Sequence, residues 1–228
     1  MRYAISDVHG CLDTFQSLLR RLRFSRNDTL YLLGDYIDRG PASKGVIQYI
    51  LDLRSDGYTL HALRGNHEQL MIDGSHDSAA QASWLRNGGR ETLASYFADG
   101  RTDIPDAHLH FLDALPYFFT SGDYLLVHAG LNFAAPDPLQ DKEGLLWERR
   151  WYDRIDYDWL GERIIVHGHT PMTRAVLEAQ NATIAEQRYQ NIDGGCYSSK
   201  PGRGYLCAFN LDDRSLLFEP RIDKVQGW

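Results

Sequence analysis

The chain has 228 residues, of which 43% are hydrophobic and 24% are charged, a composition typical of a soluble globular enzyme. This length is sufficient for one large domain with a well-buried core. The net charge of -7 argues against a protein that binds nucleic acid through a generally basic surface. It does not exclude an anionic substrate, because a local group of arginines or metal ions can reverse the electrostatic field at one site.

Short apolar runs alternate with helical patterns in the first third of the chain. The apolar runs are 3–5, 30–33 and 59–63, and apolar residues recur at helical spacing over 12–22 and 46–53. This strand–helix–strand–helix–strand order favours parallel strands joined by right-handed crossovers.

The segment 68–115 is predicted to be mostly helical. Glycine-containing breaks interrupt the pattern at 87–89 and at Asp99-Gly100, and Pro105 and Pro116 bound the last helix.

The last third of the chain is predicted to return to strands, at 124–127, 164–166, 205–209 and 216–218. Gly122-Asp123 and Asp212-Asp213 are typical of hairpin turns, and 132–142 is predicted to be a surface loop. No shift in composition marks a domain boundary, so we expect one α/β domain over residues 1–228.

The three cysteines, Cys11, Cys196 and Cys207, are too few for a disulfide framework, and we expect them to be buried or to line turns. No apolar run approaches the ~20 residues needed to cross a bilayer. The first residues, MRYAISDVHG, lack the long apolar run of a signal peptide. We therefore expect a cytoplasmic protein, with neither a membrane nor a nucleic acid as its partner.

Metal-capable side chains directly follow five of the predicted strands. They are Asp7 and His9 in DVHG, Asp35 in GDYIDRG, Asn66 and His67 in RGNHE, His128 in HAG, and His167 and His169 in HGHTP. Each alone is typical of a turn residue or a buried structural histidine. Together they indicate a site, because ligands of open α/β sheets bind at the carboxyl ends of strands. Neighbouring glycines would let the backbone approach an ion closely: Gly10, Gly34, Gly65, Gly130 and Gly168.

The types of ligand suggest the metal. Carboxylate, imidazole and amide groups without thiolate suit manganese, iron or zinc, and we expect Mn²⁺. More ligands are present than one tetrahedral ion needs, so two ions that share a carboxylate are expected. Two metal ions ~3.5–4 Å apart can generate a hydroxide at neutral pH and stabilise in-line displacement at phosphorus.

Three arginines accompany these motifs: Arg39 in GDYIDRG, Arg64 in RGNHE and Arg149 in LLWERR. A guanidinium group can donate two parallel hydrogen bonds to phosphate oxygens. We therefore predict that these arginines bind a phosphate group.

The motifs DVHG, GDYIDRG, LRGNHE, HAGL and HGHTP, in this order from Asp7 to Thr170, resemble the phosphoprotein phosphatase branch of the calcineurin-like metallophosphoesterases. The segments WLRNGG and FLDALP are similar to those of its compact bacterial members. The resemblance implies a four-layer αββα sandwich with two mixed β-sheets.

The resemblance also implies roles for individual residues. Asp7 and His9 would bind the first metal, Asp35 would bridge both, and Asn66, His128 and His169 would complete the second site. His169 is preferred to His167 because it directly precedes the threonine of the family motif. His67 would be the general acid, oriented by Asp38, and Arg39, Arg64 and Arg149 would hold the non-bridging phosphate oxygens.

The implied activity is that of a serine/threonine protein phosphatase, a metal-dependent phosphomonoesterase that acts on a phosphorylated protein or peptide through a metal-bridging hydroxide. The chain differs from the larger eukaryotic members, which carry RAHQ in place of HGHT and SAPNYC in place of the segment 191–204. The substrate specificity of those members therefore does not carry over.

Two alternatives remain open. Symmetrical diadenosine-tetraphosphate hydrolases share DVHG and GD but typically have VARGP and LGNHD, where this chain has Asp38 and Arg64. These two residues favour a phosphomonoester of a protein as the substrate. The other alternative is a catalytically inactive binding module structured by metal.

Two further mechanisms are set aside. Six residues, rather than five, separate Cys196 from Arg203, so the phosphate loop of cysteine-dependent phosphatases is absent. No Gly-x4-Gly-Lys-Ser/Thr motif of nucleotide triphosphatases occurs.

Overall fold

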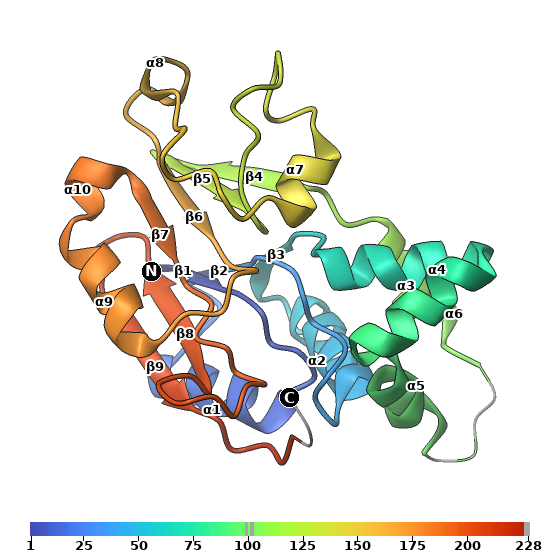
Figure 1. Ribbon diagram of the computed structural model, residues 1–228. Coiled ribbons are helices and arrows are strands. Elements are labelled where there is room, and N and C mark those ends of the chain that lie inside the picture. The colour runs from blue at the N-terminus through green and yellow to red at the C-terminus, as the bar shows by residue number, and fades with distance from the viewer. Residues whose placement is uncertain (99, 101–102, 226–228) are drawn as a thin grey trace.

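Two stacked β-sheets form the centre of the molecule (Figure 1), and the computed structural model describes residues 1–98, 100 and 103–225. The first sheet has the strand order β3-β2-β1-β8-β9 and the second has the order β4-β5-β6-β7. The strands are β1 (Arg2–Ile5), β2 (Thr29–Leu32), β3 (Thr59–Ala62), β4 (Phe118–Ser121), β5 (Tyr124–Val127), β6 (Ile164–His167), β7 (Tyr189–Asn191), β8 (Tyr205–Asn210) and β9 (Leu216–Pro220). Both sheets mix parallel and antiparallel pairs, as expected from the sequence.

The register of the parallel strands aligns their carboxyl ends. Ile5 of β1 lies opposite Leu32 of β2, and Leu32 lies opposite Ala62 of β3. In the second sheet β5, β6 and β7 are parallel as well. The segments that leave these strands are therefore close together at one end of the sandwich.

Helices surround the two sheets. They are α1 (Leu12–Leu22), α2 (Ser43–Ser55), α3 (Asn66–His76), α4 (Ser78–Trp84), α5 (Arg90–Phe97), α6 (Asp106–Asp113), α7 (Lys142–Trp147), α8 (Tyr157–Leu160), α9 (Arg174–Ala182) and α10 (Ile184–Gln187), with a π-helical turn, η1 (Leu85–Gly89), between α4 and α5. Phe15 of α1 and Ile47 of α2 share a core with Ile5 and Leu32 on the outer face of the first sheet.

The alternation of side chains along the strands divides the rest of the core in two. Leu126 and Val166 face the first sheet and pack with Phe209. Val127 and Ile165 point the other way, where Leu145 of α7, Trp151 and Leu160 of α8 cover them. The layers are therefore helix, sheet, sheet and a thinner layer of short helices and loops, which confirms the predicted sandwich.

The helices α3 to α6 lie together beside the sheets (Figure 1) and confirm the helical prediction for this segment. The predicted break at 87–89 is the π-helical turn, in which Gly88 has φ +113°. Pro105 directly precedes α6, as expected. Asp99, part of the other predicted break, lies outside the described residues.

Several elements carry no clear pattern in the sequence. Strand β7 has three residues and includes the buried polar residues Gln190 and Asn191. Helix α9 buries Leu177 alone, and α8 and α10 have four residues each. Neither alternation nor helical periodicity can be recognised in segments of this kind.

No helix within residues 1–98, 100 and 103–225 has the length and apolar character needed to span a bilayer. The three cysteines are buried and form no disulfide. The cytoplasmic location stays a prediction.

Tyr36 ties together the ends of β2 and β3. Its buried hydroxyl donates to the Leu63 carbonyl at 2.7 Å, lies 3.0 Å from the Leu32 carbonyl, and accepts from the Gly34 N–H at 3.1 Å. Replacing Tyr36 with Phe leaves buried backbone groups unpaired, so Tyr36→Phe is expected to lower the free energy of unfolding by about 1–3 kcal/mol. Urea denaturation with an unchanged m-value measures this loss.

Tyr157→Phe is the matched control for that experiment. Its hydroxyl is exposed and lies 3.4 Å from a carbonyl oxygen, so a change below about 0.5 kcal/mol is expected. An equal loss of unfolding free energy in both variants would contradict the stabilising role assigned to the Tyr36 hydroxyl.

Candidate metal centre

The structure brings the predicted metal ligands together at the carboxyl ends of the strands. Each follows β1, β2, β3, β5 or β6, and none is more than 4% exposed: Asp7, His9, Asp35, Asn66, His128 and His169. Six side chains from five segments of the chain therefore share one buried cluster.

Asp35 lies between two histidines and faces each with a different oxygen. Its Oδ2 is 3.4 Å from His9 Nε2, and its Oδ1 is 3.4 Å from His128 Nε2. Two groups with metal-ligand spacing result, one of His9, Asp35 and His67 and one of Asp35, His128 and His169. Asp35 belongs to both groups.

In the second group, hydrogen-bond acceptors face one another. The Asn66 Oδ1 atom lies 2.9 Å from His128 Nε2 and 2.8 Å from His169 Nδ1. His128 Nδ1 donates to the Leu33 carbonyl at 2.7 Å, so its Nε2 is an acceptor when the ring is neutral. Burial lowers the pKa of both histidines, that of His169 to about 2. The three acceptors can share at most the single proton of His169, and a cation would satisfy all of them.

In the first group, His9 is oriented by the backbone. Its Nδ1 donates to the Ile37 carbonyl at 2.8 Å, which directs Nε2 toward Asp35 and toward Asp7 at 4.0 Å. Burial, and then the neighbouring Arg39, lower the pKa of His9 well below its usual value, so the ring is neutral.

Asp7 is held by its neighbours in the fold. The His169 N–H donates to its Oδ2 at 3.0 Å, and the Ser6 hydroxyl donates to the same oxygen. Burial, and then Asp193, raise the pKa of Asp7. Buried carboxylates and neutral imidazoles that converge in this way suit a pair of divalent cations.

Glu68 fixes the loop that carries Asp35. Its Oε2 accepts from the N–H groups of Asp35 (2.9 Å) and Gly65 (2.8 Å), and its Oε1 accepts from Tyr36 N–H (2.8 Å). Burial, and then Asp35, raise the pKa of Glu68 to about 7. The sequence prediction assigned Glu68 no role, although a glutamate at the third position of a helix is the signature of a capping box.

Close backbone packing explains two of the predicted glycines. A Cβ at Gly65 would lie 2.2 Å from Asp35 Oδ1, and one at Gly168 would lie 1.6 Å from Ser6 Oγ. Only glycine fits at either position.

Backbone strain also collects at the cluster. Nine non-glycine residues within the described part of the chain have positive φ, and six of them belong to the predicted site: Asp7, His9, Asp35, Asp38, Arg39 and His169. Such residues are uncommon and cluster at functional sites.

His67 and Asp38 form a hydrogen-bonded pair at the edge of the cluster. His67 Nδ1 donates to Asp38 Oδ2 at 2.6 Å, and Asp38 is fully buried. The other ring nitrogen, Nε2, therefore faces the cluster and lies 3.9 Å from Asp35 Oδ2.

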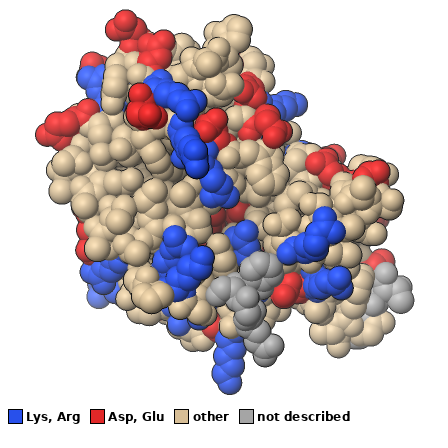
Figure 2. Space-filling model, viewed as in Figure 1, with Lys and Arg blue, Asp and Glu red and all other residues tan. Residues whose placement is uncertain are grey.

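Two of the three predicted arginines lie at the cluster. Arg39 donates to Nε2 of His9 and to Nε2 of His67, each at 2.8 Å. Arg149 donates to the His169 carbonyl at 2.9 Å and to the Thr170 hydroxyl at 3.2 Å. Figure 2 shows Lys and Arg side chains gathered across the middle of this face of the molecule, next to acidic atoms.

Arg64, the third predicted arginine, makes its contacts at the end of α6, and its phosphate-binding role stays a prediction. It donates to Gln69 Oε1 at 2.8 Å and to the Asp113 carbonyl at 2.5 Å, and it packs on the Tyr117 ring at 5.3 Å. Its guanidinium is therefore turned toward the end of α6, where carbonyl oxygens and an aromatic face offer it partners, and not toward the metal ligands.

The preference for His169 over His167 agrees with the geometry. His167 Nε2 lies 3.2 Å from the Tyr152 hydroxyl, and its ring packs against Trp151 at 5.1 Å. His167 thus belongs to the outer core of the second sheet, outside the cluster.

Three residues at the cluster were not predicted. The ring centroids of Tyr197 and His9 lie 4.8 Å apart in an edge-to-face arrangement, and those of Trp147 and His169 lie 6.1 Å apart. Asp193 is buried, its Oδ2 has no hydrogen-bond partner among the described residues, and burial raises its pKa to about 6. Asp193 and Tyr197 lie in the segment 191–204, whose glycines signalled only a loop.

Comparisons with known proteins agree with this geometry. The sequence profile of the calcineurin-like phosphoesterases matches residues 3–203. A symmetrical bis(5'-nucleosyl)-tetraphosphatase of Delftia acidovorans is 38% identical over 132 residues, which are 57% of this chain and 44% of that protein. Serine/threonine-protein phosphatase 1 of Salmonella typhimurium is 41% identical over 88 residues, 38% of each chain. The chain thus spans less than half the length of these relatives.

Among solved structures, a protein provisionally assigned as a diadenosine tetraphosphatase has the same fold, with a TM-score of 0.66 at 20% identity over 99% of this chain and 94% of its own. The profile match covers most of the chain, including every predicted metal ligand. The chain belongs to the calcineurin-like phosphoesterase family, whose members are metal-dependent phosphoesterases.

Proposed function

We propose that this protein hydrolyses a symmetrical dinucleoside polyphosphate at a two-metal centre. The observation that carries the hydrolytic part is the sharing of Asp35 between two groups of ligands. The first ion would be held by Asp7, His9 and Asp35, and the second by Asp35, Asn66, His128 and His169. Mn²⁺ is the proposed ion, with iron and zinc as alternatives, because the ligands are oxygen and nitrogen atoms without thiolate.

Bound ions would supply charge stabilisation for the phosphoryl oxygens and a water of lowered pKa. The chain's own residues orient the substrate and move a proton. His67 Nε2 faces the cluster and, when the ring is protonated at both nitrogens, can donate a proton to the leaving oxygen, while Asp38 holds the ring at Nδ1. Arg39 and Arg149 lie where they can bind phosphate oxygens.

The surroundings of the cluster support a dinucleotide as the substrate. One side carries Arg39 and Tyr197, with the guanidinium 4.2 Å from the ring centroid, and the other side carries Arg149 and Trp147. Aromatic side chains stack on nucleobases with about 1–3 kcal/mol per base. A symmetrical substrate needs phosphate and base contacts on both sides of the bond that breaks.

The relatives support the same choice. The proteins from Delftia acidovorans and Dechloromonas aromatica, which match over 57% of this chain, are both symmetrical bis(5'-nucleosyl)-tetraphosphatases. Arg64 is one of the two residues whose presence in the sequence favours a phosphoprotein, and its hydrogen bonds to Gln69 and Asp113 give that choice no support.

A phosphorylated protein or peptide is the second candidate, favoured by the His67–Asp38 pair. A serine or threonine alkoxide is a poor leaving group and needs a proton as the bond breaks, whereas a nucleoside diphosphate leaves readily as an anion. A buried carboxylate 2.6 Å from the ring is the arrangement that such a general acid requires. The Salmonella typhimurium phosphatase is the relative that matches this candidate.

Asp35→Asn is expected to remove both ions, because one carboxylate serves both ligand groups. Metal analysis of the purified variant by mass spectrometry measures the loss. Asp158→Asn, an exposed aspartate on α8, is the control and should retain the wild-type metal content. Two ions retained in Asp35→Asn would refute the bridging role.

His67→Asn is expected to lower kcat by about 10²–10⁴-fold with metal content unchanged, since it removes the proton donor. Steady-state hydrolysis of phenyl phosphate measures the effect, and His110→Asn, at an exposed position on α6, is the control. A kcat equal to that of the wild type would remove His67 from the mechanism.

The substrate proposal predicts a higher kcat/KM for diadenosine tetraphosphate than for phosphoserine or phosphothreonine peptides. Both assays use the same Mn²⁺-loaded enzyme, and ADP as the nucleotide product would establish symmetrical cleavage. A higher kcat/KM for the phosphopeptides would refute the dinucleotide as the substrate and support a phosphorylated protein or peptide.

A further inference from the structure

Asp38 carries more hydrogen bonds than its contact with His67. Its buried carboxylate accepts from Trp84 Nε1 at 3.0 and 3.1 Å and from the Thr92 hydroxyl at 2.6 Å. Its backbone N–H lies 2.9 Å from the same Thr92 oxygen. Three side-chain donors thus converge on one carboxylate that is 0% exposed.

These donors come from the helices beside the sheets. Trp84 is the last residue of α4 and Thr92 lies in the first turn of α5. They are 46 and 54 residues away from Asp38 in the chain. The contact therefore joins the helical segment to the loop that follows β2.

Two glycines of the π-helical turn allow this contact. Gly88 has φ +113°, and its carbonyl accepts from the Arg39 N–H at 3.3 Å. A Cβ at Gly89 would lie 2.5 Å from Trp84 Cε2, so only glycine lets the turn pack on the indole. Trp84, Gly88 and Gly89 of the sequence W-L-R-N-G-G thus meet at this junction.

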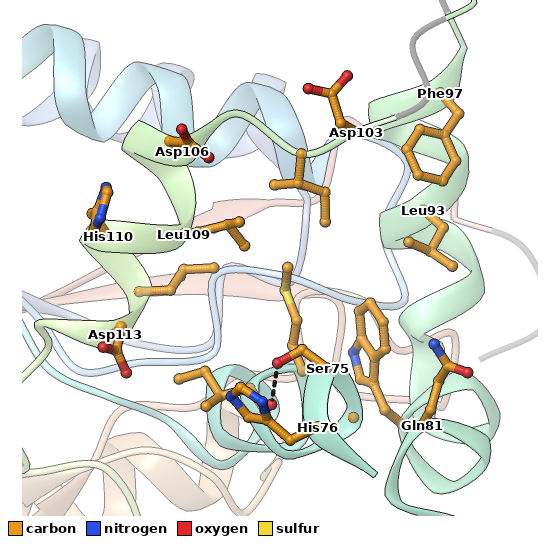
Figure 3. Close-up of a pocket in the computed structure, with 16 residues that line it drawn as sticks. Ser75, His76, Gln81, Leu93, Phe97, Asp103, Asp106, Leu109, His110 and Asp113 are labelled. Atoms are coloured by element: carbon orange, nitrogen blue, oxygen red, sulfur yellow. Dashed lines mark hydrogen bonds between the residues drawn. The ribbon is translucent and has the colours of Figure 1, made fainter. Parts of the chain in front are cut away.

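The indole packs on Gly89 at one side and borders a cavity at another. It lines a cavity of about 670 Å³ between α3, α4, α5 and α6, which Leu93 and Leu109 also line (Figure 3). The cavity contains none of the metal ligands. The two hydrogen bonds to Asp38 are therefore the specific contacts that set the position of Trp84 Nε1.

We propose that Trp84 and Thr92 are positioning residues for the general acid His67, acting through Asp38. Trp84 Nε1 and the Thr92 hydroxyl fix the orientation of the carboxylate, and that orientation presents Oδ2 to His67 Nδ1. The donors also stabilise the buried negative charge, which otherwise carries a large desolvation cost. His67 is thereby oriented with Nδ1 donating to Asp38 and with Nε2, the nitrogen that would carry the transferred proton, directed at the cluster. This inference rests on the proposed phosphoesterase function.

The variants Trp84→Phe and Thr92→Val test the proposal, because each removes one donor and keeps most of the volume. Thr92→Ser keeps the hydroxyl and is the conservative rescue. Leu93→Ala is the structural control, since Leu93 packs in the same helical segment without contact to Asp38. Each Mn²⁺-loaded variant is assayed with phenyl phosphate, a poor leaving group, and with p-nitrophenyl phosphate, a good one.

For Trp84→Phe and Thr92→Val we expect kcat on phenyl phosphate to fall by about 10–100-fold, the range typical of partners that orient a functional group. On p-nitrophenyl phosphate kcat should fall less than about threefold, because a good leaving group needs little proton donation. KM and metal content should stay at wild-type values, and Thr92→Ser should restore both rates.

An equal loss on both esters would overturn the proposal, and so would a Leu93→Ala variant that reproduces the selective loss. The proposed function would fail differently, because then the wild-type enzyme would show no metal-dependent hydrolysis of diadenosine tetraphosphate, whatever the ratio of its rates on the two esters.

Discussion

The carboxylate of Asp35, shared between two sets of imidazoles, is the interaction on which the rest of the site depends. Its two oxygens face the rings of His9 and His128, each 3.4 Å away, and these neutral imidazoles do not neutralise its buried charge. Burial, and then Asp193, raise the pKa of its neighbour Asp7. Two buried carboxylates in one cluster are stabilised by cations, which ties the charge balance of the core to metal binding.

The backbone positions Asp35 before any metal is considered. Glu68 accepts three N–H groups from the loop and from the start of α3, so the cap of a helix and the bridging ligand are one structure. Positive φ at Asp35, Asp7 and His169 has an energetic cost of order 1–3 kcal/mol each. The well-packed sheets beneath these loops offset that cost, and a rigid site needs less rearrangement when it binds ions.

The ligands could be predicted from the sequence because their position depends on topology alone. Parallel strands place their carboxyl ends together, so an Asp, Asn or His directly after a strand must lie near the others. The direction in which long side chains point could not be predicted from the sequence. Arg64 lies in a specific motif, yet its guanidinium donates to acceptors at Gln69 and Asp113. The tertiary structure brings the Asp113 carbonyl near.

The same limit applies to the elements that were not predicted. Strand β7 is buried by its neighbours β6 and α9 and not by an apolar sequence of its own. Tyr197 contacts His9 from a glycine-rich segment whose sequence shows no hydrophobic periodicity. Hydrophobic periodicity predicts single helices and strands, whereas the positions of these residues depend on contacts between elements.

The acid and the substrate contacts come from different parts of the fold, and this separation bears on the choice of substrate. Asp38, Trp84 and Thr92 are buried. The position of the general acid His67 therefore depends on how the helical segment packs against the loop after β2. Tyr197 and Trp147 are half-buried and lie in segments that leave the sheets after β7 and β5. A buried acid is compatible with either leaving group, because proton donation that an alkoxide requires does not hinder departure of a diphosphate. Selection between a dinucleotide and a phosphopeptide therefore falls on the aromatic and arginine side chains around the cluster, where substitutions can change the substrate without disturbing the chemistry beneath.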